Sequence, residues 1–187
     1  MRVAPEQLDQ LLHPQFDPKA KVDVIAKGMN ASPGAAVGAV VFSSDAAVHY
    51  HNIEKPCILV RWETTPDDLR GMVAAEGILT SHGGKTSHAA VIARGMGAPC
   101  VCGAEALRID AKAKQVEISG TGVVLHEGDI ISINGTTGDI ILGEVPLTRP
   151  ELTGDLETIL EWADDVRRDA SRGRIFGVRT NADNPAD

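Results

Sequence analysis

The sequence predicts a mixed α/β fold of the β/β/α type. Between residues 57 and 94, short apolar runs alternate with segments of helical pattern, and this alternation favours parallel strands joined by helices. Between residues 114 and 142 the pattern changes to short runs in which apolar and polar residues alternate, which is typical of β-strands. Together these observations predict a domain that closes near Glu144.

The first twenty residues predict a short helix and a linker. Leu8, Leu11 and Leu12 have helical spacing, and the prolines at positions 14 and 18 interrupt the pattern.

Strands of small residues begin near residue 21. The sequence ASPG at residues 31–34 predicts a turn in which Gly34 is suited to a positive φ. Residues 35–42 then predict a strand, in which Gly38 allows a bulge or a close backbone approach. The segment that follows is only weakly amphipathic.

The first strand–helix unit begins with a buried type of strand at residues 57–60, and Arg61 leaves that strand towards the carboxyl edge of the sheet. Thr65 is a candidate N-cap followed by proline, and Asp68 stands three residues after the cap. This box-like start predicts a helix through Ala75.

The second unit contains the most informative stretch of the chain. Residues 77–80 predict a buried strand, and SHGG at residues 81–84 predicts a loop with unusual backbone angles. A helix is expected at about residues 88–94, with Gly95 and Gly97 as stop signals.

His88 is the candidate nucleophile. Thr86 or Ser87 can cap the helix, so His88 lies in its first turn, where unpaired N–H groups and a partial positive charge attract anions. Lys85 adds a cation. These positive groups disfavour imidazolium, so the ring should stay neutral and able to attack phosphorus. The same groups would then stabilise the phosphorylated product.

A structural role for the histidine is the alternative, because a histidine at a helix start is commonly a capping or surface residue. The glycine pair argues for chemistry, since side chains at Gly83 and Gly84 would obstruct access to the ring. For His82 a structural role in the loop is the better interpretation. The motif becomes specific only if its strand–loop–helix context is present.

The cysteines predict reduced thiols. Their number is odd, and Cys100 and Cys102 are too close in a strand-like run to favour a bridge. Zinc binding by these two with His82 and His88 is a weaker alternative, because the spacing of the histidines fits neither a helical pair nor a zinc finger. We therefore expect no metal site.

The β-rich part contains alternating runs at residues 114–119, 122–126 and 129–134. The sequence NGTTG then predicts a hairpin that joins the last run to residues 139–142.

Two prolines, Pro146 and Pro150, mark a boundary after this part. Asp155 can cap a helix with one apolar face, and residues 175–178 predict a further strand.

Composition excludes several classes of function. The chain has 187 residues, 43% of them hydrophobic, and a formal net charge of −8. This acidic balance lacks the basic stripe of a nucleic-acid binder. We find no apolar run long enough to span a bilayer and no leader segment, so we expect a cytoplasmic location without membrane binding.

The segment GGKTSHAAVIARGMGAPCVCG, residues 83–103, resembles the phosphohistidine segment of the phosphoenolpyruvate-utilising enzymes. Within that family, ARGMG followed by PCV is similar to the pyruvate, phosphate dikinases. Flanking stretches agree, among them NASPGAAVGAVVF upstream and GDIISINGTTGDIILGE downstream.

The resemblance assigns roles to single residues. It implies that His88 carries the phosphoryl group and that Arg94 is associated with the phosphate. Gly83, Gly84, Lys85, Thr86 and Ser87 are expected to support the phosphate site from the local pattern described above. Thr86 matches a position that a regulatory kinase–phosphorylase modifies in this family. Arg179 matches an arginine that contacts substrate in the barrel of the whole enzyme. Lys85 departs from the methionine expected at its position, so its electrostatic role is specific to this sequence.

The resemblance also implies a division of the chain. Residues 1–20 would link to an upstream ATP-binding domain, residues 21–145 would form a swivelling β/β/α phosphohistidine domain, and residues 146–187 would form a linker helix and the first strand of a truncated barrel for phosphoenolpyruvate or pyruvate. The flanking prolines are where hinges are expected.

The implied whole enzyme interconverts ATP, pyruvate and phosphate with AMP, phosphoenolpyruvate and pyrophosphate. It would be a homo-oligomer, and its Mg²⁺ would be bound mainly by domains outside this chain, which alone should be inactive and need no cofactor. Pyruvate, water dikinase, the phosphotransferase-system enzyme with the same type of histidine segment, and a non-enzymatic phosphocarrier are the alternatives.

Overall fold

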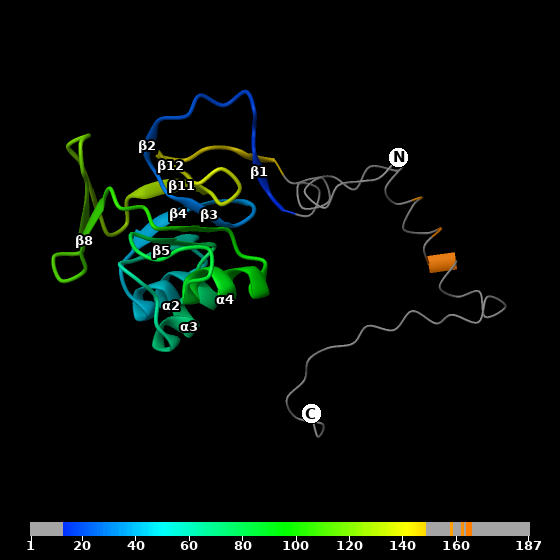
Figure 1. The fold of residues 1–187 in the computed structure, drawn as a ribbon, viewed down its shortest axis with the longest axis horizontal. Coiled ribbons are helices and arrows are strands. Elements are labelled where there is room, and N and C mark those ends of the chain that lie inside the picture. The colour runs from blue at the N-terminus through cyan, green and yellow to red at the C-terminus, as the bar shows by residue number, and fades with distance from the viewer. Residues whose placement is uncertain (1–12, 149–157, 159–161, 163, 166–187) are drawn as a thin grey trace, which may run out of the picture. The chain divides into compact units, whose positions relative to one another are not determined.

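The computed structural model describes residues 13–148 together with residues 158, 162, 164 and 165 (Figure 1). The chain divides into two units, residues 1–150 and 151–187, and the fold described here belongs to the first. The helix predicted from Leu8 to Leu12, most of the helix predicted from Asp155, the strand at residues 175–178 and Arg179 lie outside the described residues.

The architecture is mixed α/β, as predicted. The strands are β1 (Gln15–Phe16), β2 (Val24–Lys27), β3 (Met29–Ser32), β4 (Ala35–Val41), β5 (Cys57–Arg61), β6 (Gly77–Thr80), β7 (Cys100–Cys102), β8 (Leu107–Asp110), β9 (Gln115–Ile118), β10 (Val123–His126), β11 (Ile130–Asn134), β12 (Asp139–Leu142) and β13 (Leu147–Thr148). The helices are α2 (Ser44–Asn52), the 3₁₀ helix η1 (Pro66–Asp68), α3 (Leu69–Ala74) and α4 (His88–Met96).

One large sheet organises the domain, with the strand order β2-β12-β11-β4-β5-β6-β7-β3. Strands β4, β5, β6 and β7 are parallel neighbours, which confirms the pairing predicted from the strand–helix alternation. The remaining pairs of this sheet are antiparallel, including the predicted hairpin of β11 and β12. The loops at the carboxyl ends of the parallel strands therefore come to one edge.

The two edges of this sheet meet at Gly28. Strands β2 and β3 lie at opposite ends of the strand order, yet only this residue separates them in the chain. Its N–H donates to the carbonyl of Gly138 at 2.8 Å. A Cβ at Gly28 would lie 2.7 Å from Val101 Cγ1, so glycine is required where the edges close. The sheet is consequently curled and holds one core inside it.

Side chains alternate between two cores along the parallel strands. Ile58 and Val60 of β5 face the core inside the curled sheet, and Cys57 and Leu59 face the core under the helices. Along β7, Val101 belongs to the inner core, whereas Cys100 and Cys102 belong to the helical one. The helical core thus contains both of these cysteines.

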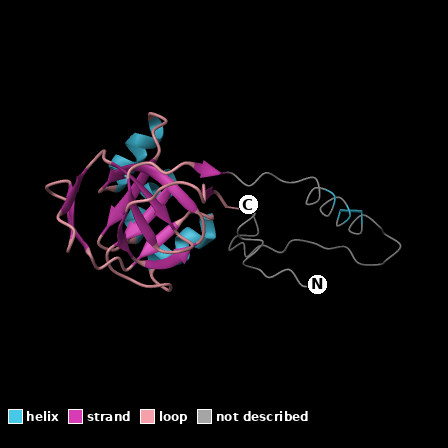
Figure 2. Cartoon of the chain, turned by 90° about the horizontal axis from the view of Figure 1, so that it is seen from above, coloured by secondary structure: helices cyan, strands magenta, loops and turns pink. Residues whose placement is uncertain are grey.

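Helices α2, α3 and α4 cover one side of the sheet (Figures 1 and 2). Helix α3 follows the predicted capping box, in which Asp68 Oδ2 accepts the N–H of Thr65 at 3.0 Å. Its first turn is the 3₁₀ helix η1, and α3 ends at Ala74. Helix α2 was not assigned from sequence, although Ser43 Oγ caps it by accepting the N–H of Ala46 at 3.1 Å.

Two smaller sheets complete the domain. Strands β8, β9 and β10 form an antiparallel sheet, of which β8 was not predicted. Strands β1 and β13 form a short antiparallel pair in which Gln15 faces Thr148 and Phe16 faces Leu147. This pair brings the two ends of the described body together.

Candidate functional site

The strand–loop–helix context predicted around His88 is present. Strand β6 ends at Thr80, and helix α4 begins at His88 itself. Of the two candidate caps, Ser87 is the one used: its φ and ψ of −64° and 160° are extended, and its Oγ accepts the N–H of Ala90 at 3.4 Å. The helix ends at Gly97, whose φ is 69°. His88 is therefore the first helical residue, beside amides that the helix leaves unpaired.

The loop between β6 and α4 is held by hydrogen bonds. Thr80 Oγ1 donates to the carbonyl of His82 at 2.7 Å, and the N–H of His82 donates to the carbonyl of Trp62 at 2.8 Å. The N–H of Ser87 donates to the carbonyl of Gly84 at 2.9 Å. These bonds fix the approach to the helix start from both sides.

An aromatic stack supports the same loop. The rings of Trp62 and His82 are parallel, with their planes 2° apart and their centroids separated by 4.7 Å. Both residues are exposed; Trp62 directly follows β5, and His82 lies two residues after the end of β6. The sequence suggested a structural role for His82 but did not reveal its partner, because the two residues are far apart in the chain.

The glycines of the motif differ from each other. Gly83 has a φ of +96°, and a Cβ there would lie 2.9 Å from the Cβ of Ser87. Gly84 has room for a Cβ, which would meet only the Met29 Cε at 3.7 Å. The contact that requires glycine at position 83 is therefore with the capping serine, whereas the sequence argument invoked the histidine ring for both positions.

Arg94 reaches back to the loop although it follows His88 by six positions. One guanidinium nitrogen, Nη2, donates to the carbonyl of Lys85 at 2.7 Å, and Nη1 donates to the carbonyl of Ala31 at 3.0 Å. The side chain thus ties strand β3 to the loop before His88 and brings a fixed positive charge to it. The side chains of Lys85 and Thr86 are exposed on this loop.

The imidazole of His88 is half buried, and its Nε2 atom is one of five buried side-chain nitrogen or oxygen atoms without a hydrogen-bond partner in the described part of the chain. This nitrogen is inaccessible to solvent and has no hydrogen-bond partner among the described residues. Buried polar atoms are nearly always paired, so an unpaired ring nitrogen at a helix start is unusual. It has a lone pair or a proton available for a group that enters the site.

An ion pair strengthens the neighbouring strand end. Arg61 Nε lies 3.4 Å from Asp68 Oδ1, an ion pair without good hydrogen-bond alignment, and Arg61 Nη1 donates to the carbonyl of Phe42 at 3.1 Å. Asp68 is only 4% exposed. Arg61 lies at the predicted edge, but its charge is directed to Asp68.

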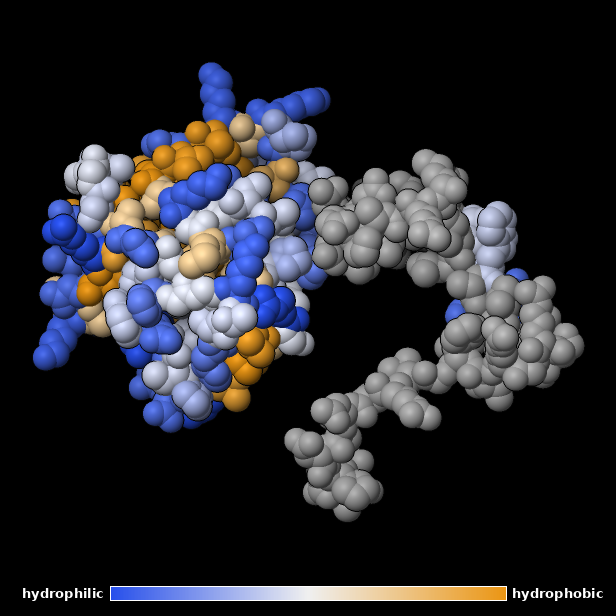
Figure 3. Space-filling model, in the orientation of Figure 1, coloured by the Kyte–Doolittle hydropathy of each residue, from blue (hydrophilic) through white to orange (hydrophobic). Residues whose placement is uncertain are grey.

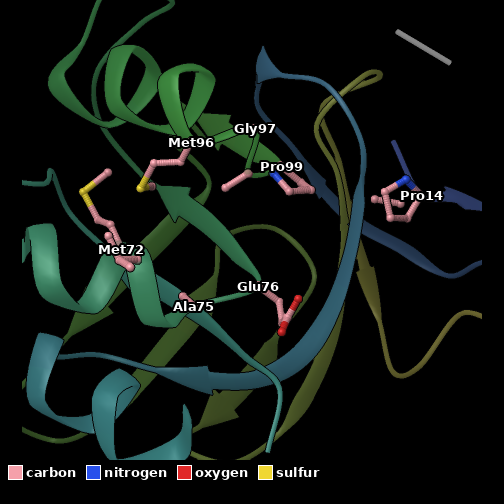
Figure 4. Close-up of a pocket in the computed structure, with 10 residues that line it drawn as sticks. Pro14, Met72, Ala75, Glu76, Met96, Gly97 and Pro99 are labelled. Atoms are coloured by element: carbon pink, nitrogen blue, oxygen red, sulfur yellow. The ribbon is translucent and has the colours of Figure 1, made fainter. Parts of the chain in front are cut away.

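Two hollows lie at the opposite end of the parallel strands. One, of about 430 Å³, is lined mainly by apolar residues, among them Pro14, Met72, Met96 and Pro99 (Figure 4). Another, of about 460 Å³, has more polar walls that include His51, Lys55 and Glu76. His88 lines neither hollow.

The described residues include no group of three or more histidine, cysteine, aspartate or glutamate side chains that could hold a metal ion. The cysteines at 57, 100 and 102 are free and buried. Within the described part of the chain, no helix has the length and apolar character needed to cross a membrane.

Comparison with known proteins adds a family match. Residues 53–138 match the family described as PEP-utilising enzyme, mobile domain. The chain is 52% identical over 186 residues to pyruvate, phosphate dikinase of Rhizobium meliloti, and 53% identical over 187 residues to pyruvate, phosphate dikinase 2 of Zea mays. These alignments cover 100% and 99% of this chain but only 20% of each relative. The chain thus spans about a fifth of the length of these relatives.

A solved structure of Enzyme I (nEIt) is a more distant match. It aligns with 63% of this chain and 41% of its own, with 21% sequence identity and a TM-score of 0.34.

Proposed function

Because the chain belongs to the PEP-utilising enzymes, through their mobile domain at residues 53–138, we propose that it is the phosphoryl-carrying part of a pyruvate, phosphate dikinase. His88 receives a phosphoryl group at one site of the longer protein and delivers it at another. The match to pyruvate, phosphate dikinases extends over nearly all of this chain. It favours their reaction over those of pyruvate, water dikinase and the phosphotransferase-system enzyme.

The observation that carries the proposal is the unpaired Nε2 of His88 at the start of α4. Because Nε2 is inaccessible to solvent, the proposed step begins with a turn of the ring towards the donor. The lone pair of this nitrogen then attacks phosphorus, and the P–O bond to the leaving group of the donor, the enolate in the case of phosphoenolpyruvate, breaks as the N–P bond forms. The leaving oxygen takes the electron pair. The unpaired amides of the first helical turn and the cations of Lys85 and Arg94 stabilise the added negative charge.

In the longer protein, the His88 loop would form one part of each of two active sites, and other domains would supply the rest. The loop offers a nucleophile and an anion cradle, while the hollows lie at the other end of the strands. We assign the nucleotide and pyruvate pockets to other parts of the longer protein. Mg²⁺ is assigned to those parts as well, and no step here is routed through it. The predicted contact of Arg179 with substrate and the homo-oligomeric state remain part of the proposal.

Movement between the two sites is assigned to a rigid-body swing of the domain. The pairing of β1 with β13 supports this idea, because it places the segments that connect the domain in both directions side by side. A swing about this pair would displace His88 without disturbing either core. The proposed hinges are residues 14–18 and 146–150.

Thr86 is the proposed regulatory site. Its side chain is exposed, two residues before His88, and is thus open to a kinase–phosphorylase. A phosphate on Thr86 would add negative charge beside the position that an anionic donor must approach. Repulsion between the two would block phosphorylation of His88.

Transfer of a labelled phosphoryl group tests the proposal. The 187-residue chain is mixed with the complementary domains and labelled phosphoenolpyruvate, and acid-labile label on the chain is counted. We expect label on the wild type, none on His88→Ala, and full label on the matched control His126→Ala, whose side chain is exposed on β10. Label retained by His88→Ala would overturn the proposal.

The longer protein separates the candidate reactions. Phosphate-dependent release of pyrophosphate is expected only of the pyruvate, phosphate dikinase. Turnover without inorganic phosphate would favour pyruvate, water dikinase, and phosphoryl transfer to a carrier protein would favour the phosphotransferase-system enzyme. The 187-residue chain alone is expected to show no turnover.

A further inference from the structure

A pair of thiols lies directly behind the candidate site. Cys100 and Cys102 stand two positions apart on β7, so their side chains share the face of the strand that is turned towards the helices. Their Sγ atoms are 3.5 Å apart, within hydrogen-bond distance for sulfur. Both residues are completely buried. The proposed phosphoryl transfer uses neither of them.

The pair is connected to the start of helix α4 through its cap. Cys102 Sγ lies 3.6 Å from Ser87 Oγ, and the same oxygen accepts the N–H of Ala90. Since the oxygen already accepts this bond, its own proton is available for donation to sulfur. A chain of contacts thus runs from Cys100 through Cys102 and Ser87 into the first turn of the helix.

The surroundings of Cys102 favour a negative sulfur. Hydrogen bonding from Cys100 and Ser87, with the positive charge of Arg94, outweighs the effect of burial and lowers the pKa of Cys102 from 9.0 to about 6. The hydrogen bond to Cys102, together with burial, raises the pKa of Cys100 well above its ordinary value. One sulfur therefore keeps its proton while the other gives its proton up.

We propose that Cys100 and Cys102 share one proton in the native chain, and that Cys102, as a thiolate, is a positioning residue that fixes Ser87 and with it the start of the helix carrying His88. The thiolate accepts the S–H of Cys100 and the O–H of Ser87. Ser87 is thereby held in the rotamer that caps the helix. The positioning of a nucleophile rests on the proposed function, whereas the shared proton and the fixed cap do not.

The first test follows the ultraviolet absorbance of the thiolate in the 187-residue chain as the pH rises. One thiolate is expected with a midpoint of about 6 in the wild type. Cys100→Ala removes the largest lowering contribution and should raise this midpoint by about one pH unit or more. Ser87→Ala should raise it by less. Cys57→Ala is the matched control and should leave it unchanged. Absence of any thiolate before the ordinary value of 9.0 would overturn the proposal.

The second test observes the cap itself by NMR. The backbone amide of Ala90 donates to Ser87 Oγ, so its resonance should move with the same midpoint as the thiolate absorbance. In Cys102→Ser, which keeps a hydrogen-bonding group but has no charge in this range, that step should vanish. A role of Cys102 in packing alone would produce no such step in the wild type. Persistence of the step in Cys102→Ser would contradict the link from Cys102 to the cap.

These two measurements need no phosphoryl donor, so their failure leaves the role of His88 untouched. The link to function is tested separately in the label-transfer assay. There, Cys102→Ser should slow the formation of acid-labile label by about tenfold without lowering its final amount, because a mispositioned nucleophile reacts slowly but still reacts. An unchanged rate would refute the positioning role, whereas label retained by His88→Ala would refute the proposed function instead.

Discussion

The two ends of the parallel strands differ in the groups and the space that they offer a ligand. At the carboxyl ends, a loop carries His88, which has an unpaired ring nitrogen. Backbone and side-chain hydrogen bonds, the stack of Trp62 on His82 and the bond from Arg94 to the carbonyl of Lys85 fix this loop. At the amino ends there are hollows of about 430 and 460 Å³, but most of the lining of the first is apolar. One end has fixed polar groups and the other has space.

For the proposed phosphoryl transfer, the volume of a hollow is a poor guide to the position of the site. A phosphoryl group is small and charged, so oriented amides and cations around a nucleophile matter more than room. Apolar areas show at several places on the face drawn in Figure 3. On the helices, Val73 of α3 and Val91 of α4 are exposed. Such surface suits contact with protein better than contact with phosphate.

The largest effect is expected from Gly83→Ala at the carboxyl end. The substitution places a Cβ 2.9 Å from the Cβ of Ser87 at a φ of +96°. We expect a loss of about 2 kcal/mol in the free energy of unfolding and slower label transfer to His88. Gly84→Ala is the matched control, because its Cβ has room, and should change stability by less than about 0.5 kcal/mol. Equal losses in urea unfolding for the two variants would contradict this account of the loop.

A smaller loss of stability is expected from Arg94→Gln. The variant loses the charge and at least one of the bonds to the carbonyls of Lys85 and Ala31, which should cost about 1 kcal/mol in stability. The rate of label transfer should fall by about tenfold. Val73→Ser, an exposed change near the amino-end hollow, serves as the control and should leave the rate unchanged. Similar rates for both variants would remove the distinction between the two ends.

At neutral pH the smallest change in stability is expected at the amino end, where the thiol of Cys57 affects stability only in alkaline solution. At the amino end of β5, burial, aided by Glu76, raises the pKa of Cys57 from 9.0 to about 11. The native state then binds more protons than the unfolded state between these values, so stability should fall as the pH rises through them. Cys57→Ala should remove this fall in urea unfolding. An identical slope in wild type and variant would contradict the prediction.

Cys102, at the carboxyl end of β7, should behave in the opposite way. Its pKa is lowered from 9.0 to about 6, so its contribution to stability should grow as the pH rises between these values and disappear below them.

Local signals were sufficient to predict the parallel strands, the hairpin of β11 and β12 and the start of α4. In each case the signal lies within a few residues, as with Ser87 capping the helix or the box at Thr65. Helix α2 was not predicted, because its amphipathic pattern is too weak to indicate a helix after the cap at Ser43.

The remaining features depend on residues distant in sequence. The closure of the sheet at Gly28 depends on a hydrogen bond to the carbonyl of Gly138. Arg94 donates to the carbonyl of Ala31, which is 63 positions away in the chain. Nor does any spacing in the sequence predict the stack of Trp62 on His82. The helix start at His88 could be predicted from its neighbours in the chain, whereas the chemistry of His88 stays a prediction. The groups that hold its loop could not be predicted from the sequence.

The central claim is that His88 carries the phosphoryl group, and phosphorus NMR of the phosphorylated chain tests it most directly. After reaction with phosphoenolpyruvate and the complementary domains, we expect one phosphoramidate resonance that is lost on acid treatment. It should be absent from His88→Ala and present in the matched variant His126→Ala, whose side chain is exposed on β10. A phosphoramidate resonance that persists in His88→Ala would contradict the claim.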